Sequence, residues 1–520
     1  MGLTAAGAVP ALGFAPEAAA AAQGRAAGQG GVARQGGAAG QGRAFAGSGA
    51  AADASLVFDP TAYTEQTISI KDTTGTAHSV TYRFFKVASY VANPVNAAYQ
   101  SLNVSAPVSI DGTAVDASDA PILFANAVGG YMPSSVANAT GISASGMGGG
   151  TSRQGLALAA GYVVVEPGAR GRSLVDANGT YYGTAPAAIV DLKAAVRYLK
   201  FNKGRVPGDV ERIVSSGVSA GGALSALLGA SGDSPLYDSY LAEIGAADTS
   251  DAIFASGDWC PITDLEHADA AYEWCWGANP PASGATVDAT ISADLKAQYT
   301  DYLASLKLRA RGYGALTARN LDTYILETFI QPSATTYLAA LTDAARDAYL
   351  AANPFITWSA GKTGFTWADF LTHVGARKKS APSFDGFDLS TPECNLFGTG
   401  TTKARHFTLY SLRHEAGDSA RLDADLPAKL HLMNPMYHLV DKVNPHRAKH
   451  WWIRLGTKDS DTSLSVAANL ATRLTALGDD VDTSYYWDAG HGADLDPSAF
   501  VSWIGEVSGH RGHRSRSRGK

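Results

Sequence analysis

The sequence predicts an α/β fold with a mostly parallel central sheet, helices on both faces, and a large, mostly helical lid insertion. Two observations predict it. Short apolar runs alternate with helical segments through much of the chain, as in parallel sheets whose crossover connections are helices. Between residues 263 and 431 helical patterns dominate instead, and the alternation returns near Trp451.

Four short apolar runs are typical of strands that are covered on both faces. They are Ile122–Val128, Tyr162–Val165, Arg212–Ser216 and Trp451–Leu455, and a further short strand is expected at Ser484–Trp487. The segment Ala187–Lys200 has apolar residues at helical spacing and follows Pro186, a residue suited to a first helical turn. Further helices are expected in the insertion, at Asp294–Arg309, Ala334–Ala351 and Trp367–Ala376.

These patterns divide the chain into parts. Residues 55–262 and 432–508 form the expected catalytic domain, and residues 263–431 form a lid, since insertions of this kind often carry function. Residues 1–54 are rich in Ala, Gly and Gln and predict a disordered leader. Its start is compatible with the remnant of an export signal, so we expect a secreted or cell-envelope protein, with a cytoplasmic one as the alternative. Residues 509–520 predict a basic, disordered tail.

Composition narrows the class of protein. The net charge is −7, and the sequence outside the two tails shows no basic footprint for nucleic acid. No apolar run approaches the roughly 18 residues of a membrane span. The cysteines, Cys260, Cys275 and Cys394, are too few for a disulfide framework and are expected as buried thiols, with a Cys260–Cys275 bridge as the alternative in a secreted protein.

The pentapeptide Gly217-Val218-Ser219-Ala220-Gly221 matches the motif G-x-S-x-G. A strand-like run precedes it and a helix-like run follows it. A nucleophile elbow requires this order, because its serine sits on a strained turn where side chains at the two glycines would collide with neighbouring chain. The motif therefore predicts Ser219 as a nucleophile. The alternative is an idle serine in a glycine-rich turn.

Two partners for Ser219 are expected after the late strands. In the α/β-hydrolase fold an acid and then a histidine follow the serine in chain order. Asp459 and Asp461 follow the first late strand, and His491 follows the second between two glycines. His491 is expected to accept the serine proton, while an aspartate orients the imidazole and stabilises its cation. Spacing alone does not choose between Asp459 and Asp461.

Backbone amides are expected to stabilise the oxyanion of the reaction. One belongs to Ala220, directly after the serine, and another to Gly129 or Gly130 in the loop after an earlier strand. The alternative for this loop is an ordinary glycine turn. Such chemistry needs no cofactor, and no Cys/His spacing indicates a metal site.

Several longer motifs surround these residues. They are Asn126–Pro133, Gly168–Arg172, Val218–Leu227, Cys260–Ile262, His267–Trp274 and Asp459–Thr462. Together they resemble bacterial tannases over residues 60–505. The resemblance implies an α/β-hydrolase with a large lid that cleaves galloyl esters to gallic acid. Fungal-type tannases carry cysteines beside the serine and the histidine, whereas this sequence has Val218 and Gly492 there.

The resemblance also implies roles for individual residues. It makes Asp459 the triad acid and Asp461 a ligand of the galloyl hydroxyls. Two lid segments resemble the stretch that holds the other two ligands, Lys379 and Glu393. Without the resemblance, both residues would be read as solvated lid surface.

The aromatic ring of the substrate would lie between Ile262 and Pro392, again by resemblance. The assignment has a physical logic, because two carboxylates accept hydrogen bonds from phenolic hydroxyls and a lysine donates to a phenolic oxygen. The expected function is hydrolysis of galloyl esters, both tannins and alkyl gallates, through an acyl-enzyme. The alternatives are another phenolic-acid esterase, such as a feruloyl esterase, and a non-catalytic hydrolase-fold binding module. The expected partner is thus a small phenolic ester, while the oligomeric state is left open.

Overall fold

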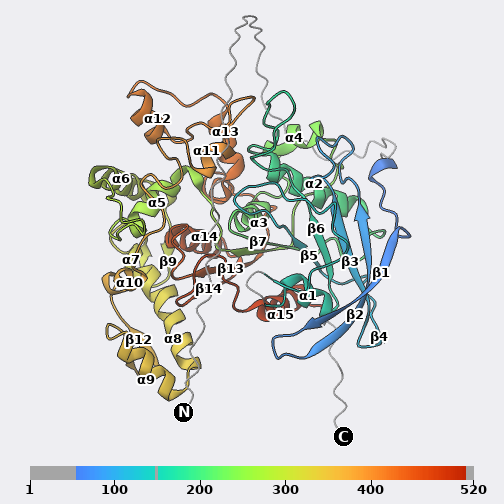
Figure 1. The fold of residues 1–520 in the computed structure, drawn as a ribbon, viewed down its shortest axis with the longest axis horizontal. Helices are drawn as coiled ribbons and strands as arrows, with labels where there is room; N and C mark the ends of the chain where they lie inside the picture. The colour runs from blue at the N-terminus through green and yellow to red at the C-terminus, as the bar shows by residue number, and fades with distance from the viewer. Residues whose placement is uncertain (1–53, 147–149, 511–520) are drawn as a thin grey trace, which may run out of the picture. The chain divides into compact units, whose positions relative to one another are not determined.

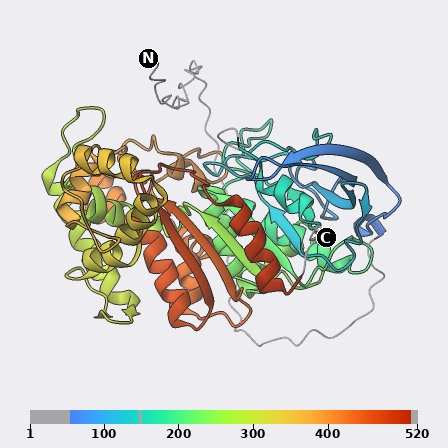
Figure 2. The same cartoon turned by 90° about the horizontal axis from the view of Figure 1, so that it is seen from below.

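The computed structural model describes residues 54–146 and 150–510. The predicted leader, apart from Ala54, and the tail from residue 511 onward lie outside the described residues. The described chain forms one compact unit, centred on a single large sheet in the order β1-β2-β3-β6-β5-β7-β8-β13-β14, with β4 beside β3. Figures 1 and 2 show this sheet from two sides.

Six neighbouring strands of the sheet, from β6 to β14, run parallel, and β1, β2 and β3 join them as an antiparallel edge. The parallel strands are β5 (Ile122–Ala125), β6 (Val163–Pro167), β7 (Ile213–Val218), β8 (Ala255–Trp259), β13 (His450–Gly456) and β14 (Asp480–Tyr486). The edge consists of β1 (Tyr63–Lys71), β2 (Ala77–Val87), β3 (Leu102–Ile110) and the short β4 (Thr113–Ala114). The predicted mostly parallel sheet is therefore confirmed.

Helices cover both faces of this sheet (Figure 1). On one side lie α2 (Ala187–Phe201), α3 (Ala220–Ala230) and α14 (Leu464–Ala476); on the other lie α1 (Arg153–Ala159) and α15 (Pro497–Ser508). Every residue of α3 is buried, because this helix packs across β7 and β8. The nucleophile motif thus joins a central strand to the most buried helix.

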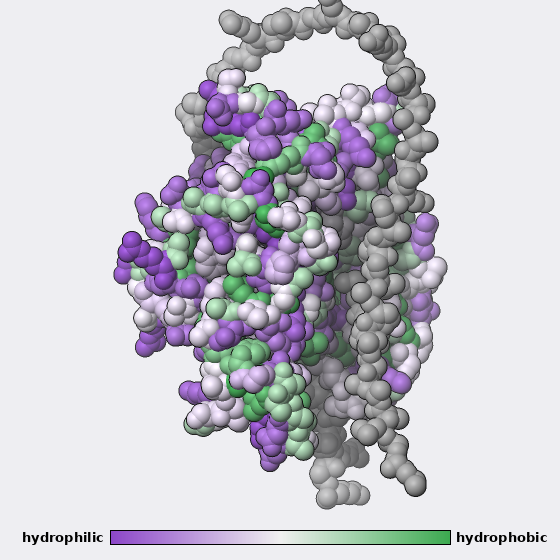
Figure 3. All heavy atoms as spheres, turned by 60° about the vertical axis from the view of Figure 1, so that its left-hand side comes forward, coloured by the Kyte–Doolittle hydropathy of each residue, from purple (hydrophilic) through white to green (hydrophobic). Residues whose placement is uncertain are grey.

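Residues 263–431 contribute no strand to the central sheet. Their helices are α5 (Leu265–Trp276), α6 (Ala289–Leu306), α7 (Leu321–Ile325), the π-helical η3 (Leu326–Ile330), α8 (Gln331–Ala340), α9 (Asp343–Ala352), α10 (Trp367–Val374), α11 (Pro392–Leu396), α12 (Leu409–Ala416) and α13 (Leu426–Met433). Two small hairpins pair Arg309–Ala310 with Gly314–Ala315 and Thr357–Ser359 with Lys362–Gly364. On the face of Figure 3, which brings these helices forward, polar and apolar residues are interspersed.

Local details differ from the sequence expectations. The single helix predicted over Ala334–Ala351 is wrong, because Leu341 is extended and the Thr342 hydroxyl caps a new helix by accepting from Ala345 N at 3.3 Å. The predicted strand Ile122–Val128 ends at Ala125, where the chain turns into the glycine loop. No helix among the described residues is long and apolar enough to cross a membrane.

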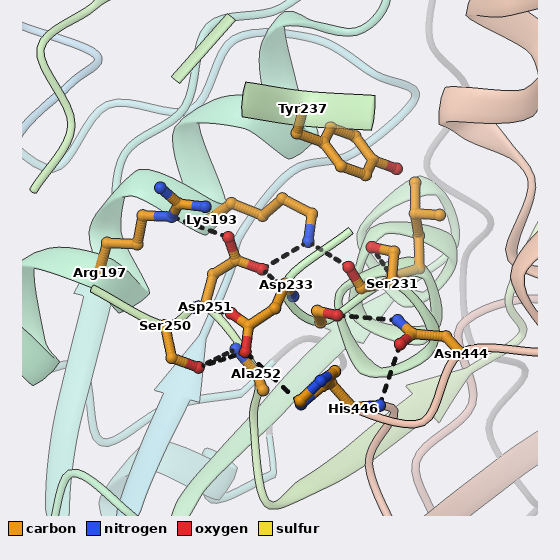
Figure 4. A network of polar contacts seen from close by, with 12 residues as sticks. Lys193, Arg197, Ser231, Asp233, Tyr237, Ser250, Asp251, Ala252, Asn444 and His446 are labelled. Atoms are coloured by element: carbon orange, nitrogen blue, oxygen red, sulfur yellow. Dashed lines mark hydrogen bonds and ion pairs between the residues drawn. The ribbon is translucent and has the colours of Figure 1, made fainter. Parts of the chain in front are cut away.

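A buried polar network links the helices on one face of the sheet (Figure 4). Lys193 of α2 is fully buried, and its Nζ donates to Asp251 Oδ1 and to the Ser231 carbonyl, both at 2.7 Å. Its ammonium also lies 4.5 Å from the ring centre of Tyr237. Arg197 Nε donates to the other Asp251 oxygen at 2.8 Å. Each buried charge in this network is therefore paired, as expected for a structural site.

Candidate active site

Ser219 lies on a sharp turn between β7 and α3. Its φ of 61° and ψ of −122° are strained for a non-glycine residue, and its amide donates to the Trp259 carbonyl at 2.9 Å. A Cβ at Gly217 would lie 2.1 Å from Gly221 O, and one at Gly221 would lie 2.6 Å from Val128 O. Both glycines are thus required by close backbone approach. The turn has the geometry of a nucleophile elbow.

The imidazole of His491 contacts Asp459 more closely than Asp461. His491 Nδ1 is 2.8 Å from Asp459 Oδ2 and 3.9 Å from Asp461 Oδ2. Asp459 is fully buried at the end of β13, and His491 lies in the loop after β14. The described chain holds no hydrogen bond between Ser219 Oγ and His491, and in substrate-free sites this bond is often long until substrate binds.

The surroundings of His491 favour its protonated form. Burial by itself lowers the pKa of the imidazole, but hydrogen bonding with Asp459 and Cys260 and the negative charge of Asp459 outweigh burial and raise the pKa above its usual value. A stabilised imidazolium is what a general base needs after it has taken the proton of a nucleophile. Cys260 was not among the residues expected to act at the site.

The predicted oxyanion donors border the elbow. Ala220 is the first residue of α3, so its amide has no partner within the helix. Gly129 and Gly130 follow β5, and a side chain at Gly129 would meet open space. Arg172 Nε donates to the Gly130 carbonyl at 2.8 Å. The loop is therefore held through a carbonyl group, so the amides of Gly129 and Gly130 are available to donate to an oxyanion.

Asn126 joins this loop to the elbow. Its Nδ2 donates to the carbonyls of Ser216 and Gly221, each at 3.1 Å, and its Oδ1 accepts from Val128 N at 3.3 Å. A single buried amide therefore fixes the spacing between the serine turn and the glycine loop.

Helix α5 holds the segment of the helical insertion that carries Lys379. Asp269 and Glu273 lie four residues apart and share one face of the helix. Asp269 accepts the backbone amides of residues 383–385, and Glu273 forms a fully buried ion pair with Arg377. These contacts order a lid loop that has no regular secondary structure of its own.

Tyr272, on the same face of α5, connects the segment that carries Lys379 with the loop that carries Asp459 and Asp461. Its hydroxyl accepts from Lys379 N at 3.0 Å and donates to the Ser460 carbonyl at 2.7 Å. Ser460 lies between Asp459 and Asp461. One tyrosine thus brings together the lid lysine and the loop that carries both aspartates.

Three predicted galloyl ligands differ in their present partners. Glu393 is buried, and its Oε2 has no hydrogen-bond partner. Lys379 Nζ lies 3.5 Å from the ring centre of Phe384 and makes no hydrogen bond within the described chain. Burial raises the pKa of Glu393 and lowers that of Lys379, in both cases against the attraction between the two groups. Asp461 instead pairs with Lys378 at 2.8 Å.

The two residues expected to sandwich the ring lie on different elements. Ile262 is close to the elbow, because its amide points to the Ser219 carbonyl at 3.4 Å and its own carbonyl accepts from the Tyr131 hydroxyl at 3.1 Å. Pro392 is exposed at the first position of α11, directly before Glu393.

Sequence reasoning missed Asp488, which precedes His491 by three residues. Asp488 has a φ of 59°. Its carboxylate lies 2.6 Å from His373 Nε2 and 2.9 Å from Lys458 Nζ, and it also accepts from the Tyr349 hydroxyl. Helices α9 and α10 of the insertion therefore fix the start of the loop that carries His491. No motif signals this contact, since its members are far apart in the sequence.

The sheet, the elbow after β7 and the Asp–His pair on the last two strand ends define an α/β-hydrolase. The family model described as BD-FAE matches residues 144–297, while no curated protein matches the sequence. Among solved structures, the tannase of Fusobacterium nucleatum is 37% identical, with a TM-score of 0.75 and coverage of 88% of this chain and 100% of that one.

A tannin acyl hydrolase in complex with ethyl gallate is 36% identical and the native enzyme from Lactobacillus plantarum 35%; each has a TM-score of 0.76 and coverage of 87% of this chain and 99% of its own. The protein belongs to the bacterial tannase family and is a carboxylic ester hydrolase.

Proposed function

We propose that this protein hydrolyses galloyl esters, from alkyl gallates to tannins, to gallic acid and an alcohol through an acyl-enzyme on Ser219. The observation that carries the proposal is the buried, unpaired carboxylate oxygen of Glu393. Such an oxygen is costly unless a ligand supplies a donor, and a phenolic hydroxyl is a suitable donor. Solved structures of a tannin acyl hydrolase in complex with ethyl gallate and with 3,4-dihydroxybenzoate support this choice.

Catalysis follows from the elbow and its partners. Ser219 Oγ attacks the ester carbonyl while His491 takes its proton, and Asp459 stabilises the resulting imidazolium. The amides of Ala220 and of the glycine loop stabilise the oxyanion. His491 then returns the proton to the leaving alcohol, and a water molecule activated by the same imidazole releases gallate.

The galloyl part of the substrate is recognised by residues of the lid and of the loop that carries Asp459 and Asp461. Lys379, Glu393 and Asp461 bind the three adjacent hydroxyls, and Ile262 and Pro392 contact the two ring faces. The ion pair between Lys378 and Asp461 leaves a carboxylate that a second donor is able to share, because each oxygen accepts more than one hydrogen bond. Analogues that lack these hydroxyls leave buried polar groups unpaired and are rejected.

Hydrolysis of methyl gallate beside methyl ferulate and a simple butyrate ester tests the proposal. We expect methyl gallate to be cleaved well ahead of both, and Ser219→Ala to lose at least about 10⁴-fold in kcat with unchanged melting temperature. Faster hydrolysis of methyl ferulate or of the butyrate ester would overturn the assignment of the galloyl ligands but would leave Ser219 as the nucleophile. Full activity of Ser219→Ala would overturn the acyl-enzyme.

A further inference from the structure

A cysteine thiol lies against the Asp459–His491 pair. Cys260 Sγ, a ring nitrogen of His491 and a carboxylate oxygen of Asp459 all lie within 4.8 Å of one another. The three residues follow β8, β14 and β13 respectively. Thiolate, imidazole and carboxylate are together the donor set that zinc and similar thiophilic divalent cations bind.

The cluster is rigid on one side and open on the other. Cys260 is only 2% exposed and has a φ of 38°, a strained position for a residue with a side chain. Its amide donates to the Arg454 carbonyl at 2.6 Å, which anchors it to β13. The His491 side chain is 25% exposed, so an ion reaches the cluster along the imidazole.

A second cluster provides a contrast, since Asp385, Cys394 and His406 also lie within 4.8 Å of one another. There the donors already have protein partners: His406 bonds Asp385 at 2.7 Å and Glu415 at 2.9 Å, and Asp385 also accepts two backbone amides. All three residues are buried. An ion would have to break this network, so this cluster serves as the control.

We infer that Cys260, His491 and Asp459 form an inhibitory site for a thiophilic divalent cation. On binding, the Cys260 thiol and the His491 imidazolium each release a proton to water, and the ion accepts lone pairs from sulfur, nitrogen and oxygen, with no change of oxidation state. The imidazole that carries the proton in the reaction and the aspartate that stabilises its cation then become metal ligands, and turnover stops until the ion is removed. The inhibition rests on the proposed function, whereas the binding does not.

Cadmium chloride titrated into the full chain tests the site. Binding is followed by calorimetry and by the thiolate-to-metal absorption band, and inhibition by ester hydrolysis relative to each variant's own metal-free rate. Loss of even an outer partner weakens a metal site by about 10–100-fold. We therefore expect Cys260→Ala to raise both the Kd and the half-inhibitory concentration at least about tenfold. Cys275→Ala and Cys394→Ala should match the unmodified chain, and a chelator should restore activity.

The variant Cys260→Ser, which keeps the size of the side chain, guards against a folding defect and should show the same shift. Unchanged cadmium affinity in both Cys260 variants would overturn the site, as would loss of binding in Cys394→Ala instead. Binding through Cys260 with unimpaired turnover would overturn the inhibition. Binding through Cys260 in a protein that hydrolyses no ester would support the site and contradict the proposed function.

Discussion

Two lysines of this protein have different surroundings. The ammonium of Lys193, on a helix that covers the sheet, contacts the Asp251 carboxylate, the Ser231 carbonyl and the Tyr237 ring. The ammonium of Lys379, in the insertion, contacts the face of Phe384 and makes no hydrogen bond within the described chain. Their carboxylate neighbours differ in the same way. Asp251 accepts from Lys193 and Arg197, while one oxygen of Glu393 has no partner.

The pKa values of the two carboxyl groups express this difference. Burial acts to raise both. For Asp251 the nearby Lys193 and Arg197 reverse the effect and lower the pKa overall, whereas for Glu393 the attraction of Lys379 is too weak and the pKa is raised. A paired buried charge stabilises the fold, and an unpaired one indicates a group that a ligand completes. The comparison therefore separates a structural network from the proposed binding site.

The largest expected effect is on stability. Lys193→Met leaves Asp251 with one cation fewer in the core and should lower the free energy of unfolding by about 3–5 kcal/mol. The matched change Lys379→Met removes an ammonium without a hydrogen bond and should alter that free energy by less than about 1 kcal/mol. Urea unfolding of both variants measures the difference. Equal losses would mean that the lid lysine is structural as well.

The next effect is on selectivity. Glu393→Ala and Asp461→Ala should each reduce kcat/KM for methyl gallate about 10–100-fold more than for methyl benzoate, because charge-assisted hydrogen bonds contribute roughly 1.5–3 kcal/mol. Glu327 is an exposed carboxylate of the same insertion. Glu327→Ala therefore provides the control and should leave the ratio of kcat/KM between methyl gallate and methyl benzoate unchanged. If both esters lose equally, these carboxylates do not read the hydroxyls.

The smallest effect is on the pH dependence of stability, to which Glu393 and Asp251 contribute with opposite signs. The pKa of Glu393 is raised above 4.5, so its contribution to stability is present below pH 4.5 and is lost as pH rises through that pKa. The pKa of Asp251 is lowered below 3.8, so its contribution is present above pH 3.8 and is lost as pH falls through that pKa. As pH rises above 4.5, Glu393→Gln should raise the Tm increasingly, and Asp251→Asn should lower the Tm throughout the same range. A Tm for Glu393→Gln that falls across this range would contradict the assignment.

The parts predictable from sequence are those whose cause is local. The elbow follows from Gly217, Ser219 and Gly221, because a side chain at either glycine position would collide with nearby backbone. Strand β8 was not predicted, because its residues are Ala-Ser-Gly-Asp-Trp and its burial depends on neighbours such as Ser225, which hydrogen-bonds into it. A polar strand of this kind lacks the apolar run that sequence reasoning needs.

Contacts between residues that are distant in the sequence could not be predicted from the sequence for a similar reason. Nothing local distinguishes Lys378 from Lys379, yet only the first pairs with Asp461, since the turn that Arg377 anchors determines the direction of each side chain. Cys260 likewise meets His491 only through the sheet order, in which β13 lies between β8 and β14. Tertiary contacts, not propensities, determine these pairs.

The most direct test of the binding site avoids turnover. Methyl gallate is titrated calorimetrically into Ser219→Ala and into Ser219→Ala with Glu393→Ala, and methyl benzoate is titrated into both as the matched ligand. If the unpaired carboxylate recognises the hydroxyls, the second change should weaken methyl gallate binding at least about tenfold and leave methyl benzoate binding unaltered. Equal affinities of the two proteins for methyl gallate would contradict the account.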